Sequence, residues 1–331
     1  DGKQFVIEGT TTIATASNAG NQKIVPYIPV GALPGSGTQA DPFTISSADE
    51  WEVFTKNVGN SYSYSGKFVE LRADISVTQK CGSVAGNTPF RAFSGTFLGG
   101  GHTITMNISD WGNQGTALFS YINGATIKNL TVAGTITASQ YHTAGIVGFA
   151  DGTNLIEGCT VTAQLNIRSD YAGGFVGHGR ESNTTIKDCI FAGTIAGLDA
   201  NRGNVAGIWG WCDNGSYTID NCMERGTYSR ISSFHPIGLQ GDKGTVSRCY
   251  YLNPVRGITA TTSGAYQVSS EPVEGEVSKQ LRLLDGKTYY VPCLVSNIEE
   301  FYELAQGGTL SITPAVKLPD GTQLSSGTDY T

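Results

Sequence analysis

Residues 172–189 read AGGFVGHGRESNTTIKDC, with three glycines in the first six positions, a Val-Gly-His step and a closing Thr-Ile-Lys-Asp-Cys. The glycines resemble a phosphate-binding loop, but no Gly-Lys-Ser/Thr follows them and no helical pattern begins there. Segments of the same pattern occur before and after this one at regular intervals. We therefore interpret the stretch as one unit of an internal repeat.

The repeat has five copies, and four of its cysteines indicate the period. Cys159, Cys189, Cys222 and Cys249 lie 30, 33 and 27 residues apart. The copies begin TALFSYINGATIKNLTVAGTI (116–136), AGIVGFADGTNLIEGCTVTAQL (144–165), AGGFVGHGRESNTTIKDCIFAGTI (172–195), AGIWGWCDNGSYTIDNCMERGTY (206–228) and IGLQGDKGTVSRCYYL (237–252). An earlier, atypical copy reads FSGTFLGGGHTITMNI (93–108).

Each copy contains short β-forming runs between turn residues and no helical segment. This pattern predicts an all-β fold, a parallel β-helix (β-solenoid) whose coils stack about 4.8 Å apart. Equivalent positions in such a stack form columns. The three predicted apolar columns are Ile127, Ile156, Ile186, Ile219 and Val246; Leu130, Cys159, Cys189, Cys222 and Cys249; and Ile136, Leu165, Ile195 and Tyr228.

A polar turn separates the first two columns in every copy. Its last residues are Asn129, Gly158, Asp188, Asn221 and Arg248. Gly, Asn and Asp tolerate the left-handed backbone conformation that a sharp turn requires. Arg248 lacks this preference, so we expect the last coil to be distorted.

The chain has seven cysteines, an odd number. Neighbouring strands are spaced more widely than the ~3.8 Å between β-carbons that a relaxed disulfide prefers. We therefore favour free, buried thiols in the cysteine column over disulfides, and we keep a redox or metal-binding ladder as a further alternative. Cys81, Cys212 and Cys293 lie outside the column and receive no assignment.

Four glycine pairs carry a resemblance to a known repeat. Gly-Ile-Val-Gly (145–148), Gly-Phe-Val-Gly (174–177), Gly-Ile-Trp-Gly (207–210) and Gly-Leu-Gln-Gly (238–241) each precede a Thr/Leu-Ile/Val-x-x-Cys segment. This combination resembles the GLUG motif of bacterial cell-surface, adhesin-like proteins, which also occurs in non-catalytic regions of IgA-specific metallopeptidases. The resemblance covers residues 93–252, with departures at Gln240 and Arg248. It implies a right-handed solenoid in an extracellular, bacterial setting.

The open ends of a solenoid need covers, because unpaired strand edges template aggregation. Ser47-x-x-Glu50 is a capping box, so we predict a helix over 47–58 that covers the N-terminal edge with Trp51 on the first coil. A second, short helix is predicted over 297–307. We divide the chain into an N-terminal β segment (1–40), the capping helix with the first strands (41–92), the solenoid with GLUG-like repeats (93–267), and a C-terminal cap with the start of an immunoglobulin-like module (268–331).

Composition excludes several classes of function. With 21 Lys+Arg against 28 Asp+Glu and no basic block, the chain is not expected to bind nucleic acid. It has no apolar run of transmembrane length, and Asp1-Gly2-Lys3 is not the start of a signal peptide. The four histidines share no metal-ligand spacing, and neither His-Glu-x-x-His nor Gly-x-Ser-x-Gly occurs. We therefore predict no cofactor and no metal, and a monomeric fragment of a longer protein.

One set of positions indicates a binding surface. Phe149, His178, Trp211 and Asp242 follow the second glycine of each copy, and Val147, Val176, Trp209 and Gln240 lie two residues earlier. If Ile146, Phe175, Ile208 and Leu239 point inward, strand alternation directs both sets outward. The predicted candidate ligand-binding site is a contiguous aromatic strip of Phe149, His178, Trp209 and Trp211. The alternative is that a neighbouring loop or the C-terminal segment covers this strip.

A polysaccharide-active β-helix enzyme would need clustered carboxylates, or calcium ligands beside a Lys or Arg base. The acidic residues of the copies do not share one column. The set that long loops could bring together is Arg180, Glu181, Asp199, Arg202 and Asp213. We interpret it as a solvated loop surface and predict no catalytic residue.

Three functional hypotheses remain. The first is a non-enzymatic, adhesin-like module on the bacterial cell surface that binds a glycan or a host protein through one face of the solenoid. The second is a passive stalk that holds other domains away from the cell, and the third is the β-helix enzyme. An exposed aromatic strip favours the first hypothesis, a covered strip the second, and converging carboxylates the third.

Overall fold

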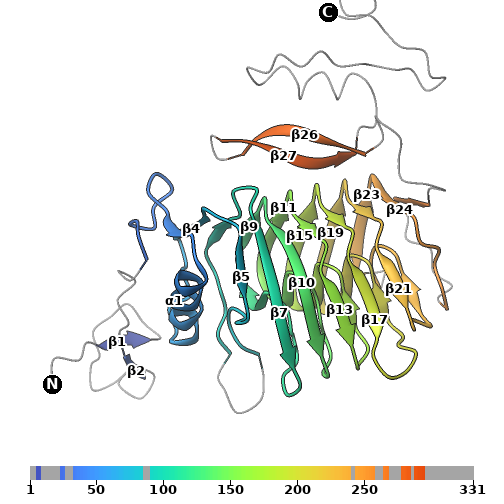
Figure 1. Cartoon of the computed structure of the whole chain (residues 1–331), viewed down its shortest axis with the longest axis horizontal. Helices are drawn as coiled ribbons and strands as arrows, with labels where there is room; N and C mark the ends of the chain where they lie inside the picture. Colours follow the sequence, from blue (N-terminus) through green and yellow to red (C-terminus); the bar gives the residue numbers. More distant parts are fainter. Residues whose placement is uncertain are drawn as a thin grey trace, which may run out of the picture.

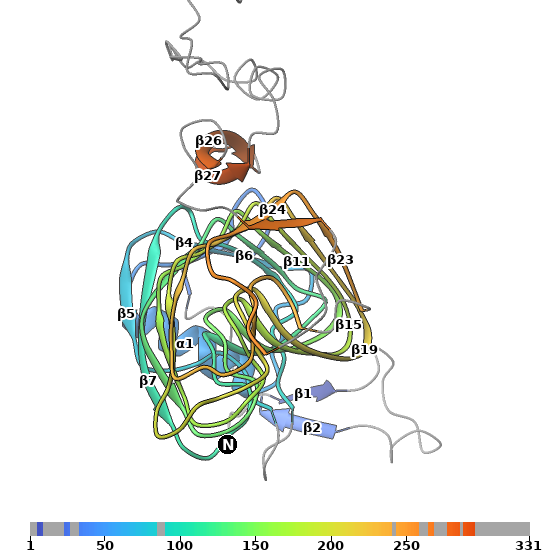
Figure 2. The same ribbon diagram turned by 90° about the vertical axis from the view of Figure 1, so that its right-hand side faces the viewer.

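The computed structural model describes residues 33–84, 90–239, 243–257 and 264–267, and the backbone of further strands at 5–8, 23–26, 277–284 and 287–294. Its main part is a β-solenoid of parallel strands stacked coil upon coil (Figure 1). Viewed along the stack, successive coils overlie one another (Figure 2), and one apolar core runs through them. The predicted solenoid is therefore confirmed.

Three parallel sheets form the walls of the solenoid. The first contains β3 (Phe43–Ile45), β4 (Phe68–Leu71), β6 (Thr96–Leu98), β9 (Thr126–Lys128), β11 (Val147–Glu157), β15 (Val176–Lys187), β19 (Trp209–Asp220) and β23 (Gly244–Ser247), with β8 (Phe119–Asn123) beside β11. The second contains β5 (Ile75–Val77), β7 (Thr103–Asp110), β10 (Thr131–Ala138), β12 (Thr160–Val161), β13 (Gln164–Ile167), β16 (Ile190–Phe191), β17 (Thr194–Gly197), β20 (Met223–Glu224), β21 (Thr227–Ser229), β24 (Cys249–Tyr251) and β25 (Ala265–Gln267). The third is short and contains β14 (Ala172–Gly173), β18 (Val205–Ala206) and β22 (Phe234–His235).

Strand register confirms the predicted apolar columns. In the first column Ile127 pairs with Ile156, and the pairing continues through Ile186 and Ile219 to Val246. The same column extends toward the N-terminus through Phe43, Val69 and Phe97, which the repeat pattern does not reveal. The third column, from Ile136 to Tyr228, is likewise in register. Burial of these side chains supplies most of the favourable free energy of the stack.

The polar turn between the first two columns has the predicted left-handed backbone in every copy. Its φ values are 51° at Asn129, 64° at Gly158, 56° at Asp188, 55° at Asn221 and 49° at Arg248. The expectation that Arg248 distorts this turn is wrong, because its backbone matches that of the other four residues. The physical reason is an ion pair, which offsets the strain of a left-handed arginine.

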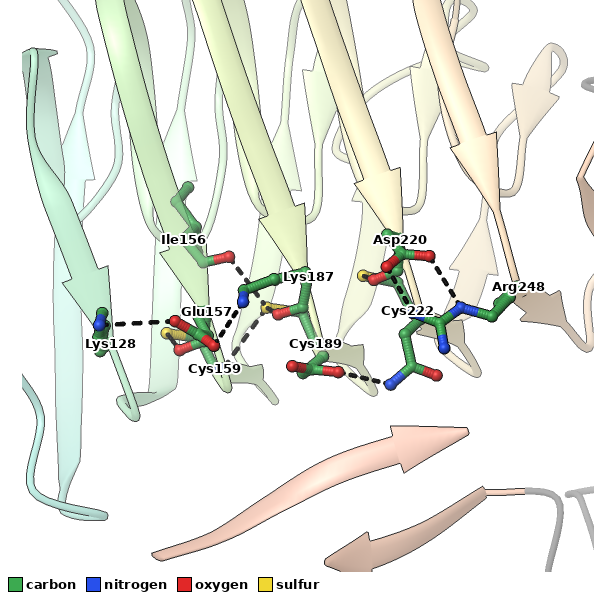
Figure 3. A network of polar contacts seen from close by, with 11 residues as sticks. Lys128, Ile156, Glu157, Cys159, Lys187, Cys189, Asp220, Cys222 and Arg248 are labelled. Atoms are coloured by element: carbon green, nitrogen blue, oxygen red, sulfur yellow. Dashed lines mark hydrogen bonds and ion pairs between the residues drawn. The ribbon is translucent and has the colours of Figure 1, made fainter. Parts of the chain in front are cut away.

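The ion pair belongs to a ladder of alternating charges that precedes the turn (Figure 3). Glu157 lies between two lysines, 3.6 Å from Lys128 Nζ and 2.8 Å from Lys187 Nζ. In the next coil Asp220 lies beside Lys187 and accepts from Arg248 Nη2 at 2.7 Å. Burial alone would raise the pKa of Asp220, but the hydrogen bonds from Arg248 and the attraction of Lys187 lower it. Opposite charges on adjacent strands stabilise the register.

The cysteine column consists of buried thiols, and no disulfide joins the described cysteines. Each thiol lies 3.1–3.3 Å from the carbonyl two residues before it and 3.6–3.8 Å from a carbonyl of the preceding coil. Burial raises the pKa of the Cys189 and Cys249 thiols well above the usual range, so both remain protonated. The column thus combines apolar packing with weak donation to turn carbonyls, which an aliphatic side chain cannot provide. Cys81 and Cys212 are also buried in the core.

In three repeats the first glycine lies in the bend before a strand of the first sheet and lets the chain approach the second sheet closely. A β-carbon at Gly145 would lie 2.5 Å from Val161 Cγ1, and one at Gly174 would lie 2.4 Å from Phe191 Cδ2. The equivalent Gly207 faces Glu224 at 2.4 Å. Because β-carbons do not tolerate such distances, only glycine fits at these three positions.

The predicted N-terminal cap is present as α1 (Ala48–Gly59). Ser47 Oγ accepts from Glu50 N at 3.3 Å, while Glu50 Oε2 accepts from Ser46 N at 2.6 Å, one residue earlier than the usual capping box. Trp51 is fully buried and packs edge-on against Phe97 and Phe119 of the first coils. The helix therefore closes the N-terminal end of the core (Figure 1).

Two antiparallel strand pairs lie before and after the solenoid in the sequence. β1 (Phe5–Glu8) pairs with β2 (Lys23–Pro26), and β26 (Val277–Leu284) pairs with β27 (Lys287–Leu294). The predicted helix at 297–307 and the start of an immunoglobulin-like module lie outside the described residues, as does the repeat position Asp242.

Candidate functional site

A second corner of the coil lies just before the first glycine of each repeat. Its residues His142, Tyr171 and Asn204 have φ values of 68°, 62° and 50°. Asn and His are both enriched in this conformation, whereas a bulky Tyr is an outlier. The corner therefore holds two ring side chains, and its backbone conformation is one that Tyr disfavours.

The surface beside this corner contains a shallow pocket. The hollow has a volume of about 210 Å³ and is lined by Tyr141, His142, Tyr171, His178, Trp211 and Asp213. We refer to it as the aromatic hollow. Its lining comes from three successive coils, with the corner residues on one side and the β15 and β19 strand residues on the other.

The rings of the aromatic hollow contact one another in a continuous chain. His142 stacks on His178 with centroids 4.2 Å apart, and Tyr171 lies edge-on to Trp211 at 4.7 Å. Tyr141 contacts Tyr171 at 5.8 Å and is 44 % exposed. Such contacts fix the ring orientations, so the lining is arranged before any ligand arrives.

Asp213 connects two of these rings by hydrogen bonds. Its Oδ1 accepts from Trp211 Nε1 at 2.7 Å, and its Oδ2 lies 3.0 Å from His178 Nε2. The Asp213 side chain is 47 % exposed. A partly solvated carboxylate thus stands at the rim and fixes the indole and imidazole planes.

Both histidines are held neutral by their surroundings. Burial lowers the pKa of His142 to about 3, and the neighbouring His178 adds to this effect. Burial also lowers the pKa of His178, although Asp213 opposes the shift. At neutral pH the only formal charge in the lining of the hollow is therefore the Asp213 carboxylate.

The predicted aromatic strip is only partly present. Phe149, His178 and Trp211 lie side by side in register, and His178 and Trp211 line the hollow, although His178 is only 5 % exposed. Phe149 is 6 % exposed, because its ring lies against the loop at Gly115, in a cluster with Val84 and Tyr121, and against His142 at 4.9 Å. The alternative of a covering loop thus holds for Phe149.

The prediction that Val147, Val176 and Trp209 point outward is wrong, because all three are fully buried. Trp209 is fully buried in the main core and stacks on Tyr217 with centroids 5.0 Å apart. Ile208, which was expected to point inward, lies in a bend, and β19 begins only at Trp209. Strand alternation does not run across a bend, so both residues face the interior.

The residues that could form a catalytic cluster do not gather around one point, although the strand register places Arg180 opposite Asp213. Arg180 makes an ion pair with Asp151 and lies over the Phe90 ring at 4.9 Å. Arg202 pairs with Asp199, and Asp213 belongs to the aromatic hollow. The hollow itself contains one carboxylate.

A buried carboxylate lies elsewhere, inside the last coils. Glu224 takes the place of Phe191 in its column and is fully buried. It accepts from Gly226 N at 2.8 Å, Tyr228 Oη at 2.9 Å and Asn253 Nδ2 at 3.0 Å. Burial raises its pKa to about 7 despite these donors. Glu224 thus ties the last turn to the core and does not border the hollow.

Two further findings concern the described part of the chain. No three His, Cys, Asp or Glu side chains gather there in a way that could hold a metal ion. None of its helices combines the length and the apolar character needed to cross a membrane.

Sequence reasoning missed half of the hollow, namely Tyr141, His142 and Tyr171. These residues lie in the turn before each glycine pair, where the copies differ most. Aligning His142 with Tyr171 and Asn204 would have exposed the signal, because a turn column with two ring side chains departs from the Asn/Asp/Gly pattern of the other corner.

Comparison with known proteins supports the fold. A solved structure of a Bacteroides ovatus protein, provisionally named an immunoglobulin A1 protease, matches with a TM-score of 0.50 and 18 % identity, over 77 % of this chain and 94 % of that one. At this identity the likeness shows a shared β-solenoid architecture. No protein-family model matches the chain, and no curated protein does so either.

Proposed function

We propose that this chain is a non-enzymatic, adhesin-like module of a bacterial surface protein, and that it binds a glycan through the aromatic hollow. The observation that carries the proposal is the corner of His142 and Tyr171. Apart from Tyr64, the other described non-glycine residues with a left-handed backbone have no ring, whereas here two rings in that conformation border a recess. Strain of this kind accumulates at functional sites.

The form of the hollow supports a glycan ligand. Aromatic faces beside a few polar groups suit the apolar faces and hydroxyl groups of sugar rings. A volume of about 210 Å³ is below the range of pockets that enclose a whole small molecule, about 300–1,000 Å³. The hollow is therefore suited to one terminal group of a larger ligand on another surface.

The charges of the site support a binding role rather than glycoside hydrolysis. That reaction ordinarily uses two carboxyl groups flanking the scissile bond. Asp213 is the single acid among the lining residues, and Asp151 is paired with Arg180 outside the hollow. The surface setting is supported by the GLUG-like repeats and by the fold shared with a Bacteroides protein.

A passive stalk is the second candidate function. The charge ladder, the thiol column and the apolar columns satisfy one another without any ligand, as a spacer requires. The two candidates differ in what they need from the hollow, since a stalk needs nothing from Tyr141 or Trp211.

A glycan array probed with wild type, Trp211→Ala and Tyr141→Ala tests the proposal. We expect defined glycans to bind wild type and to lose at least about tenfold in affinity with either variant, the effect of removing a stacking ring worth over ~1 kcal/mol. Trp111→Ala and Phe90→Ala are matched controls, because these rings are 51 % and 47 % exposed and lie outside the hollow. Equal signal from all five proteins, or none from wild type, contradicts the proposal and leaves the stalk.

A further inference from the structure

We propose that the aromatic hollow selects a positively charged organic ammonium group at the end of its ligand. This inference rests on the proposed binding function of the same hollow and names the chemistry that it recognises. On a glycan, such a group would be the free amine of an amino sugar or an attached choline.

The ring faces provide the first reason. Tyr141, Tyr171 and Trp211 line the hollow and contact one another in sequence. The face of an aromatic ring carries the negative part of its quadrupole, so a cation that reaches such a face in the hollow is attracted to it. Neutral sugars gain stacking from the same faces but not this electrostatic attraction.

The Asp213 carboxylate provides the second reason. Each of its oxygens is engaged by one ring, Oδ1 by Trp211 Nε1 and Oδ2 by His178 Nε2. A carboxylate offers about four lone-pair sites, so acceptor capacity remains on a side chain that is 47 % exposed. The carboxylate is therefore fixed in position and still able to meet a ligand cation.

No competing positive charge belongs to the lining. The two histidines there are neutral, since burial lowers both pKa values. Arg180, the nearby arginine that acts on His178, is engaged by Asp151 and by Tyr121 Oη at 3.3 Å. The hollow thus carries one net negative charge on walls that favour cations, and charge complementarity selects the ligand.

The position of the rings provides an independent reason. The equivalent corner residue one coil later is Asn204, which is a favourable residue for the same left-handed backbone. Tyr171 holds that conformation without this advantage, and the rings of Tyr171 and His142 line the hollow. If this position served only the packing of the coils, an asparagine such as Asn204 would be sufficient there.

Two matched pairs of probes test the inference by isothermal titration calorimetry. Choline is compared with its neutral isostere, in which carbon replaces the nitrogen, and glucosamine is compared with glucose. We expect each cation to bind at least about tenfold more tightly than its neutral partner, consistent with a desolvated cation–π contact. Binding should perturb the Trp211 indole N–H signal in NMR spectra, assigned with Trp211→Phe.

Asp213→Asn keeps the shape of the rim and removes its charge. We expect it to weaken choline at least about fivefold and to leave the isostere unchanged. Asp199→Asn is the matched control, because the Asp199 side chain is equally exposed (48 %) and pairs with Arg202 away from the hollow. It should change neither affinity. Asp213→Asn also removes an acceptor from Trp211, so unfolding in urea is measured for both variants to confirm that they fold.

The possible results separate this inference from the proposed function. If glucose and the isostere bind as tightly as their charged partners, and Trp211→Ala weakens all of them, the charge preference is overturned and the proposed function stands. If choline binds wild type and Trp211→Ala equally, the charge preference at this hollow is overturned. If neither the probes nor the array glycans bind in a Trp211-dependent way, both proposals fall.

Discussion

The solenoid has two corners with the same backbone conformation and different contents. The first corner contains one residue from each coil, from Asn129 in the first copy to Arg248 in the last. All are small or polar turn residues except Arg248, which is held by an ion pair. The other contains His142, Tyr171 and Asn204. In the first corner Asn221 donates to Asp188 and Arg248 pairs with Asp220, whereas residues of the second corner line a recess. Repetition therefore marks the scaffold, and its interruption marks the candidate site.

The largest expected effect comes from placing a charge in the cysteine column next to the first corner. Cys189→Asp should destabilise the chain by several kcal/mol or prevent folding, because it leaves an unpaired carboxylate in a fully buried position. Cys189→Ala is the control and should cost only about 1–2 kcal/mol for the lost volume. Urea unfolding followed by circular dichroism measures both. Equal stabilities would show that the column is not a packing device.

Glu224 also departs from the repeat, since it replaces an apolar residue in its column, but we expect its role to be structural. Its pKa is about 7 when folded and 4.5 as the ordinary value, so the folded state binds more protons between these limits and stability falls as pH rises through that window. Between pH 4.5 and pH 8 the loss should approach about 3 kcal/mol at most. Glu224→Gln should flatten this dependence. A wild-type chain whose urea midpoint rises over the same window would contradict this assignment.

Substitutions of Asn221 measure how much the left-handed backbone of the first corner contributes to stability. Asn221→Val places a β-branched residue at φ 55° and removes the hydrogen bond to Asp188, so we expect a loss of about 1–2 kcal/mol. Asn221→Gly keeps the backbone free to adopt the turn and should cost less. The difference between the two unfolding free energies isolates the backbone contribution, and its absence would refute the conformational argument.

In the second corner we expect the opposite result, a substitution of Tyr171 that affects ligand binding and not stability. Tyr171→Asn installs the residue that the next coil already uses at Asn204, so stability should change by less than about 1 kcal/mol while ligand binding is lost. Thermal unfolding and array binding measured on one preparation provide the comparison. A large loss of stability would indicate that the Tyr171 ring is structural.

The sequence allowed the columns to be predicted residue by residue because period and chemistry repeat together. Ile156, Cys159 and Leu165 recur with substitutes of like kind, and strand pairing then places each with its equivalents. The helix of Trp51 followed from its cap signal. The first coils, including Phe43 and Val69, were missed because they lack the glycine pair and the cysteine.

The hollow was less accessible to sequence reasoning for physical reasons. Trp209 was assigned outward because alternation was continued across a bend, which the residues themselves do not reveal. Tyr141 and His142 lie in a turn, where no periodicity relates a side chain to a face. Their convergence with Trp211 depends on how three coils superpose, which is a property of the whole stack.

The charge ladder also constrains how such a stack can change in length. Its signs alternate from Lys128 through Glu157 and Lys187 to Asp220, so the pattern recurs only every second coil. Deleting the coil of Glu157 or that of Lys187 would place like charges on adjacent strands, which is destabilising, whereas deleting both restores the alternation. Duplication, recombination or design within this region should therefore succeed in steps of two coils.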